Sequence, residues 1–410
     1  MGFRVSARRS PAREPPASNA LRLRLILWLC SAAGQIFGFN ADVYSIGYPP
    51  VKIAVDARPL ASPLTGIGRY TWSLLKRMVS SDHDWFLYCD RPLTTELADT
   101  DGVRIRTGSA RGGSPASLRW TQWDYVQWAK RDGIEVFWSP RHHLPLLLPS
   151  GIRQVVTIHD LVWKRYPETM IAANLWIERL LMGPSLRRAQ QVICVSEFTA
   201  SEVAHFYPEL AGKCKVILEA AEETALRSQV TSRVVEPYLL FVGTMEPRKN
   251  LQRVIRAYAL ACREHDIPRL VIAGGSGWGN VNVEEEIQAQ GIASRVEVLG
   301  FVEQEALQAL YQDAYALLMP SIYEGFGLPV VESMRYGVPA IVGAGGALEE
   351  TAGDAALAVD VLSEIEIRDA MVKLCLDKDL HRRLSENASL RSRLFDWDVA
   401  ARETLQLLTR

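Results

Sequence analysis

Two glutamates, Glu324 and Glu332, stand with seven residues between them and carry the clearest chemistry in the chain. The run between them holds Gly325, Gly327 and the pair Leu328-Pro329, and proline suits the first turn of a helix. A helix start offers unpaired amide hydrogens to phosphate, and glycines allow a ligand to come close. Carboxylates are good acceptors for sugar hydroxyls. The pattern therefore predicts a ligand with both hydroxyls and phosphates, whereas an ordinary helix start with acidic neighbours is the alternative.

The elements that must position these residues follow from the hydrophobic pattern. Apolar runs that predict buried strands alternate with helical stretches along the whole chain, and this alternation predicts an α/β fold with doubly wound parallel sheets. The strand-like runs are 53–55, 85–89, 103–106, 136–139, 154–158, 191–195, 238–242, 269–273, 296–299 and 315–319. Since parallel strands place reactive groups at their carboxyl ends, the residues after each run are the candidates for a site.

Three such strand ends carry candidate residues. Gly66 and Gly68 open a helix, although a tight turn explains this pair equally well. His159 ends the run 154–158, where a lone histidine is usually structural. Arg248 and Lys249 follow the run 238–242, and a basic pair at such a crossing can neutralise a diphosphate.

A chain of 410 residues is long for one domain, so two domains are expected. We expect an extension at 1–50, one Rossmann-like domain at 51–225, a second at 226–395 and a terminal helix at 396–410. The linker is expected within 218–236, which lacks clear periodicity and collects charge.

The motifs resemble those of retaining glycosyltransferases of family 4 with the GT-B architecture. The run E-G-F-G-L-P-V-V-E is similar to the family's signature, T-G-I-G-R-Y to its first loop, V-T-I-H-D-L to its sugar-contacting segment and G-T-M-E-P-R-K-N to its phosphate-binding segment. The resemblance implies two Rossmann-like domains that face each other across a cleft, with the acceptor side on the first and the nucleotide sugar on the second. The chain departs from the pattern at Glu349, where proline is usual, and at 218–222, where Asn-Gly is usual.

The resemblance also implies a role for each candidate residue. The expected assignments are catalytic for His159 and Glu324, donor diphosphate for Gly66, Gly68, Arg248, Lys249, Gly327 and Leu328, donor sugar for Gly325 and Phe326, ribose for Glu332, and nucleobase for Val302.

The activity that the resemblance implies is the transfer of a sugar from a nucleotide diphosphate sugar to a glycan or lipid-linked acceptor in polysaccharide biosynthesis. Mannose from GDP-mannose is favoured because the T-I-H-D-L and G-T-M-E-P-R-K-N segments resemble the mannosyltransferase branch. We expect no cofactor and no metal ion in the chemistry. A GT-B sugar epimerase or phosphorylase and a non-catalytic nucleotide-sugar or glycan-binding protein are the alternatives.

The bulk composition restricts partners and compartment. A formal net charge of −1 gives no indication of a nucleic-acid partner. Six cysteines show no paired or zinc-like spacing, which is typical of a reducing compartment. We therefore expect a cytoplasmic protein, with peripheral contact at the inner face of the membrane left open, as is the oligomeric state.

Residues 1–50 differ from the rest of the chain. Arginines precede the apolar run 25–39, which is short for a membrane span. The small residues 31–34 within this run resemble those of a secretory signal. A membrane-surface anchor and an extension read from a misplaced start codon are the competing interpretations. We favour the last, because the ordered pattern begins at Val51.

Overall fold

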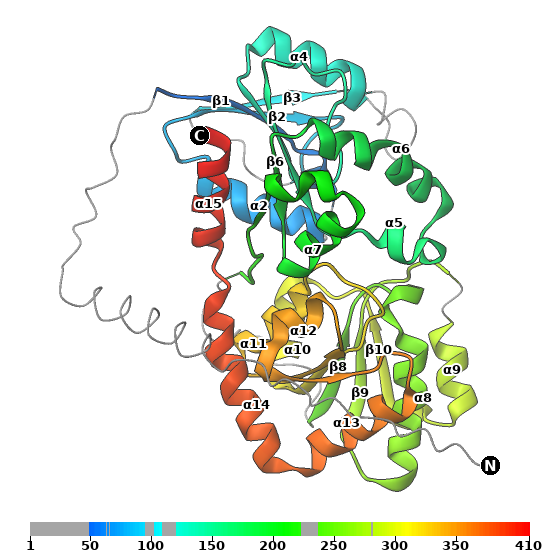
Figure 1. Ribbon diagram of the computed structural model, residues 1–410. Coiled ribbons are helices and arrows are strands. Elements are labelled where there is room, and N and C mark those ends of the chain that lie inside the picture. Colours follow the sequence, from blue (N-terminus) through cyan, green and yellow to red (C-terminus); the bar gives the residue numbers. More distant parts are fainter. Residues whose placement is uncertain are drawn as a thin grey trace, which may run out of the picture. The chain divides into compact units, whose positions relative to one another are not determined.

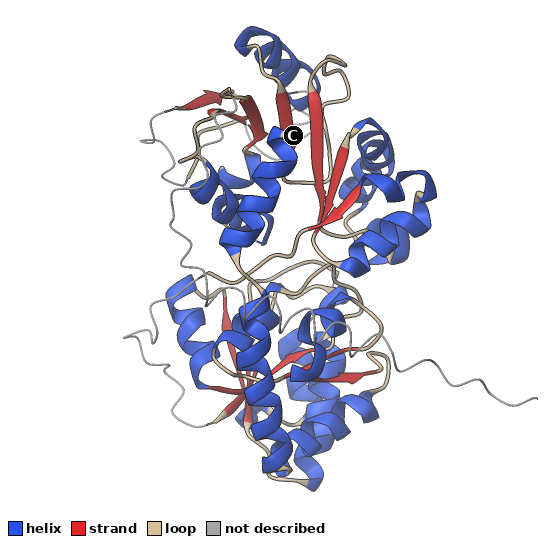
Figure 2. Ribbon diagram, turned by 60° about the vertical axis from the view of Figure 1, so that its left-hand side comes forward, coloured by secondary structure: helices blue, strands red, loops and turns tan. Residues whose placement is uncertain are grey.

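The computed structural model describes residues 49–410, apart from 63, 65, 95–101, 109–119, 223–236 and 280–281. Residues 50–410 form one compact unit. The predicted extension at 1–50 lies outside the described residues except for its last two, and most of the predicted linker lies outside them as well. The compact unit contains two parallel β-sheets, each packed with helices (Figures 1 and 2). We call the sheet and helices of residues 50–222 the N-terminal lobe and those of residues 237–395 the C-terminal lobe.

The N-terminal lobe has a parallel sheet of seven strands in the order β3-β2-β1-β4-β5-β6-β7. Its strands are β1 (Lys52–Asp56), β2 (Asp84–Cys89), β3 (Val103–Thr107), β4 (Val136–Ser139), β5 (Arg153–Ile158), β6 (Gln191–Cys194) and β7 (Cys214–Val216). Its helices are α2 (Gly66–Met78), α4 (Tyr125–Asp132), α5 (Val162–Arg165), α6 (Ala172–Arg188) and α7 (Glu197–Phe206). Strands β1, β2 and β4 to β6 are almost wholly buried, which explains their continuous apolar runs.

The C-terminal lobe has a parallel sheet of six strands in the order β10-β9-β8-β11-β12-β13. Its strands are β8 (Tyr238–Val242), β9 (Arg269–Ala273), β10 (Val296–Gly300), β11 (Ala314–Met319), β12 (Ala340–Gly343) and β13 (Ala356–Val359). Its helices are α8 (Leu251–Glu264), α9 (Val283–Gln290), α10 (Gln304–Asp313), α11 (Leu328–Arg335), α12 (Ala347–Ala352), α13 (Glu364–Leu376) and α14 (Lys378–Arg391). The chain order reverses between β8 and β11, and ligands of such sheets bind at this switch point.

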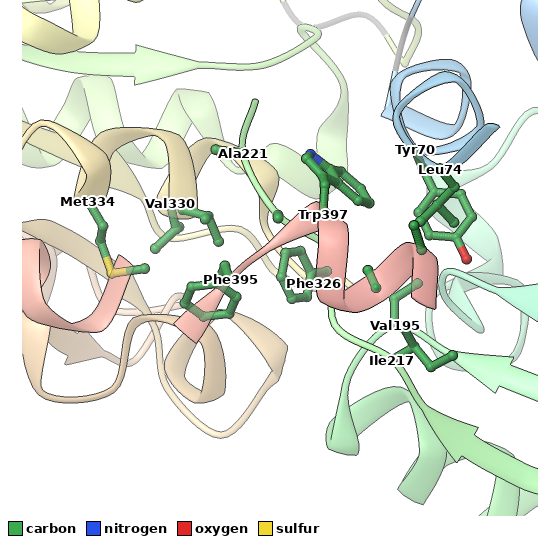
Figure 3. Close-up of a cluster of buried hydrophobic side chains, with 14 of the residues drawn as sticks. Tyr70, Leu74, Val195, Ile217, Ala221, Phe326, Val330, Met334, Phe395 and Trp397 are labelled. Atoms are coloured by element: carbon green, nitrogen blue, oxygen red, sulfur yellow. The ribbon is translucent and has the colours of Figure 1, made fainter. Parts of the chain in front are cut away.

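The last helix, α15 (Trp397–Thr409), packs on α2 of the N-terminal lobe. The Trp397 ring lies 6.0 Å from that of Tyr70, and Phe395 lies edge-on to Phe326 of the C-terminal lobe at 5.7 Å. Figure 3 shows these side chains in one buried cluster, which reaches from Leu74 to Met334. The terminal segment therefore contributes apolar side chains to a core that both lobes share.

A stretch with three tryptophans, Trp120, Trp123 and Trp128, forms a π-helical turn at Trp120–Asp124 followed by α4. Trp128 packs against Tyr88 and Tyr125, with ring centroids 5.4 and 5.7 Å away, so it belongs to the packing of this lobe. The five cysteines within the described residues are unpaired. In this part of the chain, no helix has the length and apolar character needed to cross a membrane.

Candidate functional site

Glu324 lies after β11 and makes ion pairs with both cations of the β8 loop. Lys249 Nζ donates to one carboxylate oxygen at 2.6 Å, and Arg248 donates to the other at 2.8 Å. Burial alone would raise the pKa of Glu324, but the charges of Arg248 and Lys249 outweigh it and hold the pKa at about 2. The structure thus brings together three predicted residues, two for the donor diphosphate and one for catalysis.

Arg248, whose side chain is 17% exposed, has acceptors besides Glu324. Its guanidinium also donates to Glu246 at 2.7 Å and to the carbonyl oxygen of Tyr323 at 2.9 Å. Burial alone would lower the pKa of Arg248, but the charges of Glu324, Asp160 and Glu246 outweigh it and raise the pKa above its usual value. Sequence reasoning did not single out Asp160 or Glu246, because their proximity to Arg248 depends on the tertiary fold.

The backbone after β8 explains how the two cations are positioned. Pro247–Lys249 form a single 3-10 turn, and Asn250 ends it with a φ of 62°, a conformation that asparagine tolerates better than most residues. The Asn250 amide donates to the carbonyl oxygens of Pro320 and Val361 at 3.0 and 2.7 Å. These bonds tie the loop after β8 to the loops after β11 and β13, and so fix Lys249 beside Glu324.

Glu332, on α11, has a partner from the other lobe. Arg69 on α2 donates to one of its carboxylate oxygens, and the Tyr311 hydroxyl donates to the other at 2.9 Å. The Glu332 side chain is only 7% exposed. Arg69 lies in the T-G-I-G-R-Y motif but received no role from the sequence, and no local pattern marked Tyr311.

The glycine-rich loop between the two glutamates packs closely against the N-terminal lobe. A Cβ on Gly325 would lie 1.5 Å from the carbonyl oxygen of His159, so only glycine fits there. The hydroxyls of Ser196 and Thr199 donate to the Gly325 carbonyl oxygen at 2.7 and 3.0 Å. The structure therefore explains the need for glycine at position 325 by the contact between the lobes, rather than by access for a ligand. The hydroxyl of Ser196 also caps α7, by accepting from the Thr199 amide.

The remaining residues of the loop have distinct environments. Gly327 has a φ of 111°, which favours glycine, and Leu328 begins α11. The Phe326 side chain is 5% exposed and lies in the shared core, so its backbone alone can face a donor sugar. Val302 is partly buried against the same core.

His159 has hydrogen-bond partners at both ring nitrogens. Nδ1 lies 2.9 Å from a carboxylate oxygen of Glu219, and Nε2 lies 2.9 Å from the carbonyl oxygen of Pro140. Both partners are acceptors, so the two bonds exist together only when both nitrogens carry hydrogen. The ring also meets Tyr70 edge-on at 4.8 Å. Glu219, which sequence reasoning missed, lies in the segment 218–222 that departs from the family pattern.

The first glycine pair stands where α2 begins. A Cβ on Gly68 would come within 2.9 Å of the carbonyl oxygen of Pro59, whereas Gly66 has open space around it. Gly66 is therefore the one of the two whose surroundings allow a ligand to approach. Both lie within one turn of Arg69, and hence close to the contact with Glu332.

His142 and His143 follow β4, where histidines could contact an acceptor or simply belong to a polar loop. Both lie against Glu178 of α6. Ring nitrogens of His142 and His143 lie 3.3 and 3.0 Å from the two carboxylate oxygens. Burial would raise the pKa of Glu178, but the two histidines lower it well below its usual range. This arrangement favours the structural interpretation.

A cavity of about 440 Å³, lined by residues of both lobes, opens beside Glu324. Its walls include Arg165, Tyr166, Phe198, Glu202, Tyr323 and residues 343–348. Glu332 lines a different and much smaller pocket with Tyr311 and Arg335. Within the described ranges, no three His, Cys, Asp or Glu side chains gather as a metal site would require.

Comparison with known protein families places both lobes in glycosyltransferase groups. Residues 64–219 match the family described as Glycosyltransferase Family 4, and residues 222–391 match Glycosyl transferases group 1. The chain is 28% identical over 380 residues to the O-antigen chain mannosyltransferase B of Escherichia coli, a match that covers 87% of this chain and 98% of that protein.

Solved structures of glycosyltransferases share the fold. Sucrose-phosphate synthase from Thermosynechococcus elongatus superposes with a TM-score of 0.68 and 19% identity, covering 88% of this chain and 98% of that one. HepE from Anabaena, determined with UDP and glucose, gives a TM-score of 0.67 and 17% identity over 88% and 99% of the two chains. The predicted architecture of two Rossmann-like domains is thereby confirmed.

Proposed function

The chain belongs to the family 4, group 1 glycosyltransferases, and from this premise we propose that it is a retaining mannosyltransferase that uses GDP-mannose. Its acceptor is a glycan or a lipid-linked glycan in polysaccharide biosynthesis. The observation that carries the proposal is the pairing of Glu324 with Lys249 and Arg248 beside a cavity lined by both lobes. The name of the Escherichia coli relative supports the choice of mannose.

The donor diphosphate takes over the two cations in this proposal. The carboxylate of Glu324 holds Lys249 and Arg248 in the structure. A diphosphate carries more negative charge than one carboxylate and displaces it from the cations. Glu324 then turns its oxygens to the hydroxyls of the transferred sugar. Amides at Gly66 and Leu328, the first residues of α2 and α11, complete the diphosphate site.

The other end of the donor lies along α11. Glu332 accepts from the ribose hydroxyls, which compete with Arg69 and Tyr311 for its two oxygens. The backbone at Val302 lies against the nucleobase. Glu324 precedes α11 and Glu332 lies within it, so in this proposal the two carboxylates serve different parts of the donor.

The chemical step needs charge neutralisation more than a strong acid. The bond from the anomeric carbon to the diphosphate oxygen breaks while the acceptor hydroxyl oxygen bonds to that carbon from the same face. The proton of the acceptor passes to the leaving diphosphate. Lys249 and Arg248 stabilise the charge that develops there, with no metal ion, and His159, fixed by Glu219 and Pro140, borders the reacting sugar. Closure of the two lobes excludes water.

We place this reaction in the cytoplasm, at the inner face of the membrane, where nucleotide sugars and lipid-linked acceptors meet. The test incubates the pure full-length protein with labelled nucleotide sugars, first alone and then with a mannoside acceptor. The proposal expects slow hydrolysis of GDP-mannose alone and an α-linked product with the acceptor. An isomerised donor would instead indicate an epimerase, and binding without turnover would indicate a non-catalytic protein.

A further inference from the structure

Arg141 lies in the loop after β4 and has a guanidinium that the fold does not use. The residue is only partly exposed, yet its guanidinium makes no hydrogen bond or ion pair with any residue of the described ranges. None of its nitrogens is enclosed by protein, so they are open to a ligand. Since a guanidinium carries five N–H donors, Arg141 offers a complete set of donors at one place.

The loop that carries Arg141 is tied to His159 by both neighbours of Arg141. The carbonyl oxygen of Pro140 lies 2.9 Å from Nε2 of His159, and the His159 amide donates to Nε2 of His142 at 3.2 Å. The rings of His142 and His159 lie 5.9 Å apart. In the proposed mechanism His159 borders the reacting sugar, so Arg141 stands on the acceptor side of the same place.

The carboxylates near Arg141 are occupied by other cations. Arg58, which follows β1, donates to both oxygens of Asp56 at 2.8 and 2.5 Å, and the two side chains are 11% and 2% exposed. Glu178 is shared between the two histidines that follow Arg141. The charge of Arg58 lowers the pKa of Arg141, as does burial, whereas Asp56 and Glu178 oppose both. Two guanidinium groups therefore act on each other here, and only Arg58 has a carboxylate of its own.

Other arginines of this lobe show what a purely structural role looks like. Arg106 donates to both oxygens of Asp132 at 3.2 and 2.6 Å, and Arg165 donates to both oxygens of Glu202 at 2.7 and 2.6 Å. Each of these pairs joins separate elements by two parallel bonds. Arg141 makes no such pair within the described part of the chain, although carboxylates lie near it.

We propose that Arg141 binds a phosphate group carried by the acceptor sugar. The planar guanidinium fork matches two oxygens of a phosphate, and the added negative charge offsets the repulsion between Arg141 and Arg58. The inference rests on the proposed transfer reaction and narrows its acceptor from any glycan to a sugar phosphate. That phosphate belongs either to a free phosphorylated sugar or to the link between a sugar and its lipid carrier.

The experiment measures binding by calorimetry on the full-length protein, with GDP present to occupy Lys249 and Arg248. The ligands are mannose 6-phosphate, octyl mannosyl phosphate and the neutral methyl mannoside. At least one ester should bind about tenfold more tightly than methyl mannoside, and the tighter of the two esters identifies the source of the phosphate. In Arg141→Gln the favoured ester should bind about as weakly as methyl mannoside. The matched control, Arg104→Gln, changes an arginine on β3 whose side chain is 55% exposed, and should bind like the wild type.

A second titration, in Lys249→Ala without GDP, separates this site from the donor cations. The favoured ester should keep its affinity there, because Arg141 is intact. Loss of ester binding in Lys249→Ala but not in Arg141→Gln would assign the ester to the donor site and overturn the proposal. Equal affinity of the wild type for both esters and methyl mannoside would overturn it as well. No transfer step enters these titrations, so the phosphate site and the proposed activity can fail separately.

Transfer rates give a readout that a structural role of Arg141 would not produce. Arg141→Gln should raise KM for the favoured ester about tenfold, so that the enzyme loses its preference for this ester over methyl mannoside. An equal change with both acceptors would mean that Arg141 supports the fold only, and would overturn the proposal. Circular dichroism shows whether Arg141→Gln is folded. If it is not, Arg141→Lys tests the same contact, because lysine keeps the charge but loses the two parallel donors and should bind the ester about threefold more weakly.

Discussion

The two glutamates of the same short segment are held in opposite ways. Glu324 has both of its cations, Lys249 and Arg248, within its own lobe. Glu332 has its cation, Arg69, on the other lobe, with the Tyr311 hydroxyl from its own lobe as second donor. Glu324 borders a cavity of substantial volume, whereas Glu332 lies in a narrow pocket.

The two glutamates of one sequence motif can therefore serve different physical purposes. The ion pairs of Glu324 respond to anything that competes for Lys249 and Arg248, and a diphosphate is such a competitor. The ion pair of Glu332 joins α2 to α11, so it responds to movement between the lobes as well as to ligand. We therefore expect substitutions at Glu324 to slow the chemical step while they free Lys249 and Arg248 for the diphosphate, and substitutions at Glu332 to weaken donor binding.

The largest effect should come from Glu324→Ala. Loss of the carboxylate removes the hydroxyl acceptor beside the reacting carbon, and transfer should fall by at least about a thousandfold. Circular dichroism and thermal unfolding would establish that the variant is folded. Normal turnover would remove Glu324 from the site and end the contrast with Glu332.

Lys249→Ala should have the next largest effect. Loss of a charge-assisted contact to the diphosphate should weaken donor binding about 10- to 100-fold, as measured by calorimetry with GDP. Arg256→Ala is the matched control. Arg256 also pairs with a glutamate, but it lies within α8, away from Glu324, and its side chain is 43% exposed. Equal donor affinity in wild type and Lys249→Ala would contradict the assignment.

Glu332→Gln should have a smaller and more specific effect. A neutral amide accepts a hydrogen bond less strongly than a carboxylate does, so GDP should bind about fivefold more weakly. GDP that lacks both ribose hydroxyls should bind wild type and variant alike, which makes it the control ligand. If the variant loses affinity for both ligands equally, Glu332 acts through the lobe contact with Arg69 rather than through ribose.

The acid stability of the two regions should differ as well, and this is the smallest expected effect. The pKa of Glu324 is about 2 in the folded protein against 4.5 for an ordinary glutamate. A lowered pKa gives stability that is present above the ordinary value and is lost as pH falls towards about 2. Glu324→Gln should therefore lose less stability than the wild type across this range, as measured by the urea midpoint. Glu305→Gln is the control, because Glu305 is exposed. If the urea midpoint of Glu324→Gln fell with pH as steeply as that of the wild type, the ion pairs would not stabilise the fold.

Most of the sheet architecture could be predicted from the sequence, because buried parallel strands are continuous apolar runs. Strand β8 lies at the predicted residues 238–242 and β9 at 269–273. Residue types were sufficient to single out Glu324 and Lys249 separately, but their pairing depends on β8 and β11 being neighbours in one sheet, which the sequence does not show.

Contacts between the lobes could not be predicted in the same way. Arg69 and Glu219 look like ordinary charged residues until the fold brings them to Glu332 and His159. The glycine at 325 indicated a close approach, but the group that approaches it is the His159 carbonyl. The roles of the site residues toward a donor remain predictions that the variants above test.

The central claim is that Glu324 and the donor diphosphate compete for Lys249 and Arg248. It is tested most directly by titrating GDP into Glu324→Gln and wild type by calorimetry. Because the competing charge is gone, the variant should bind GDP about tenfold more tightly while its transfer activity is lost. Unchanged or weaker binding of GDP by Glu324→Gln would contradict the account.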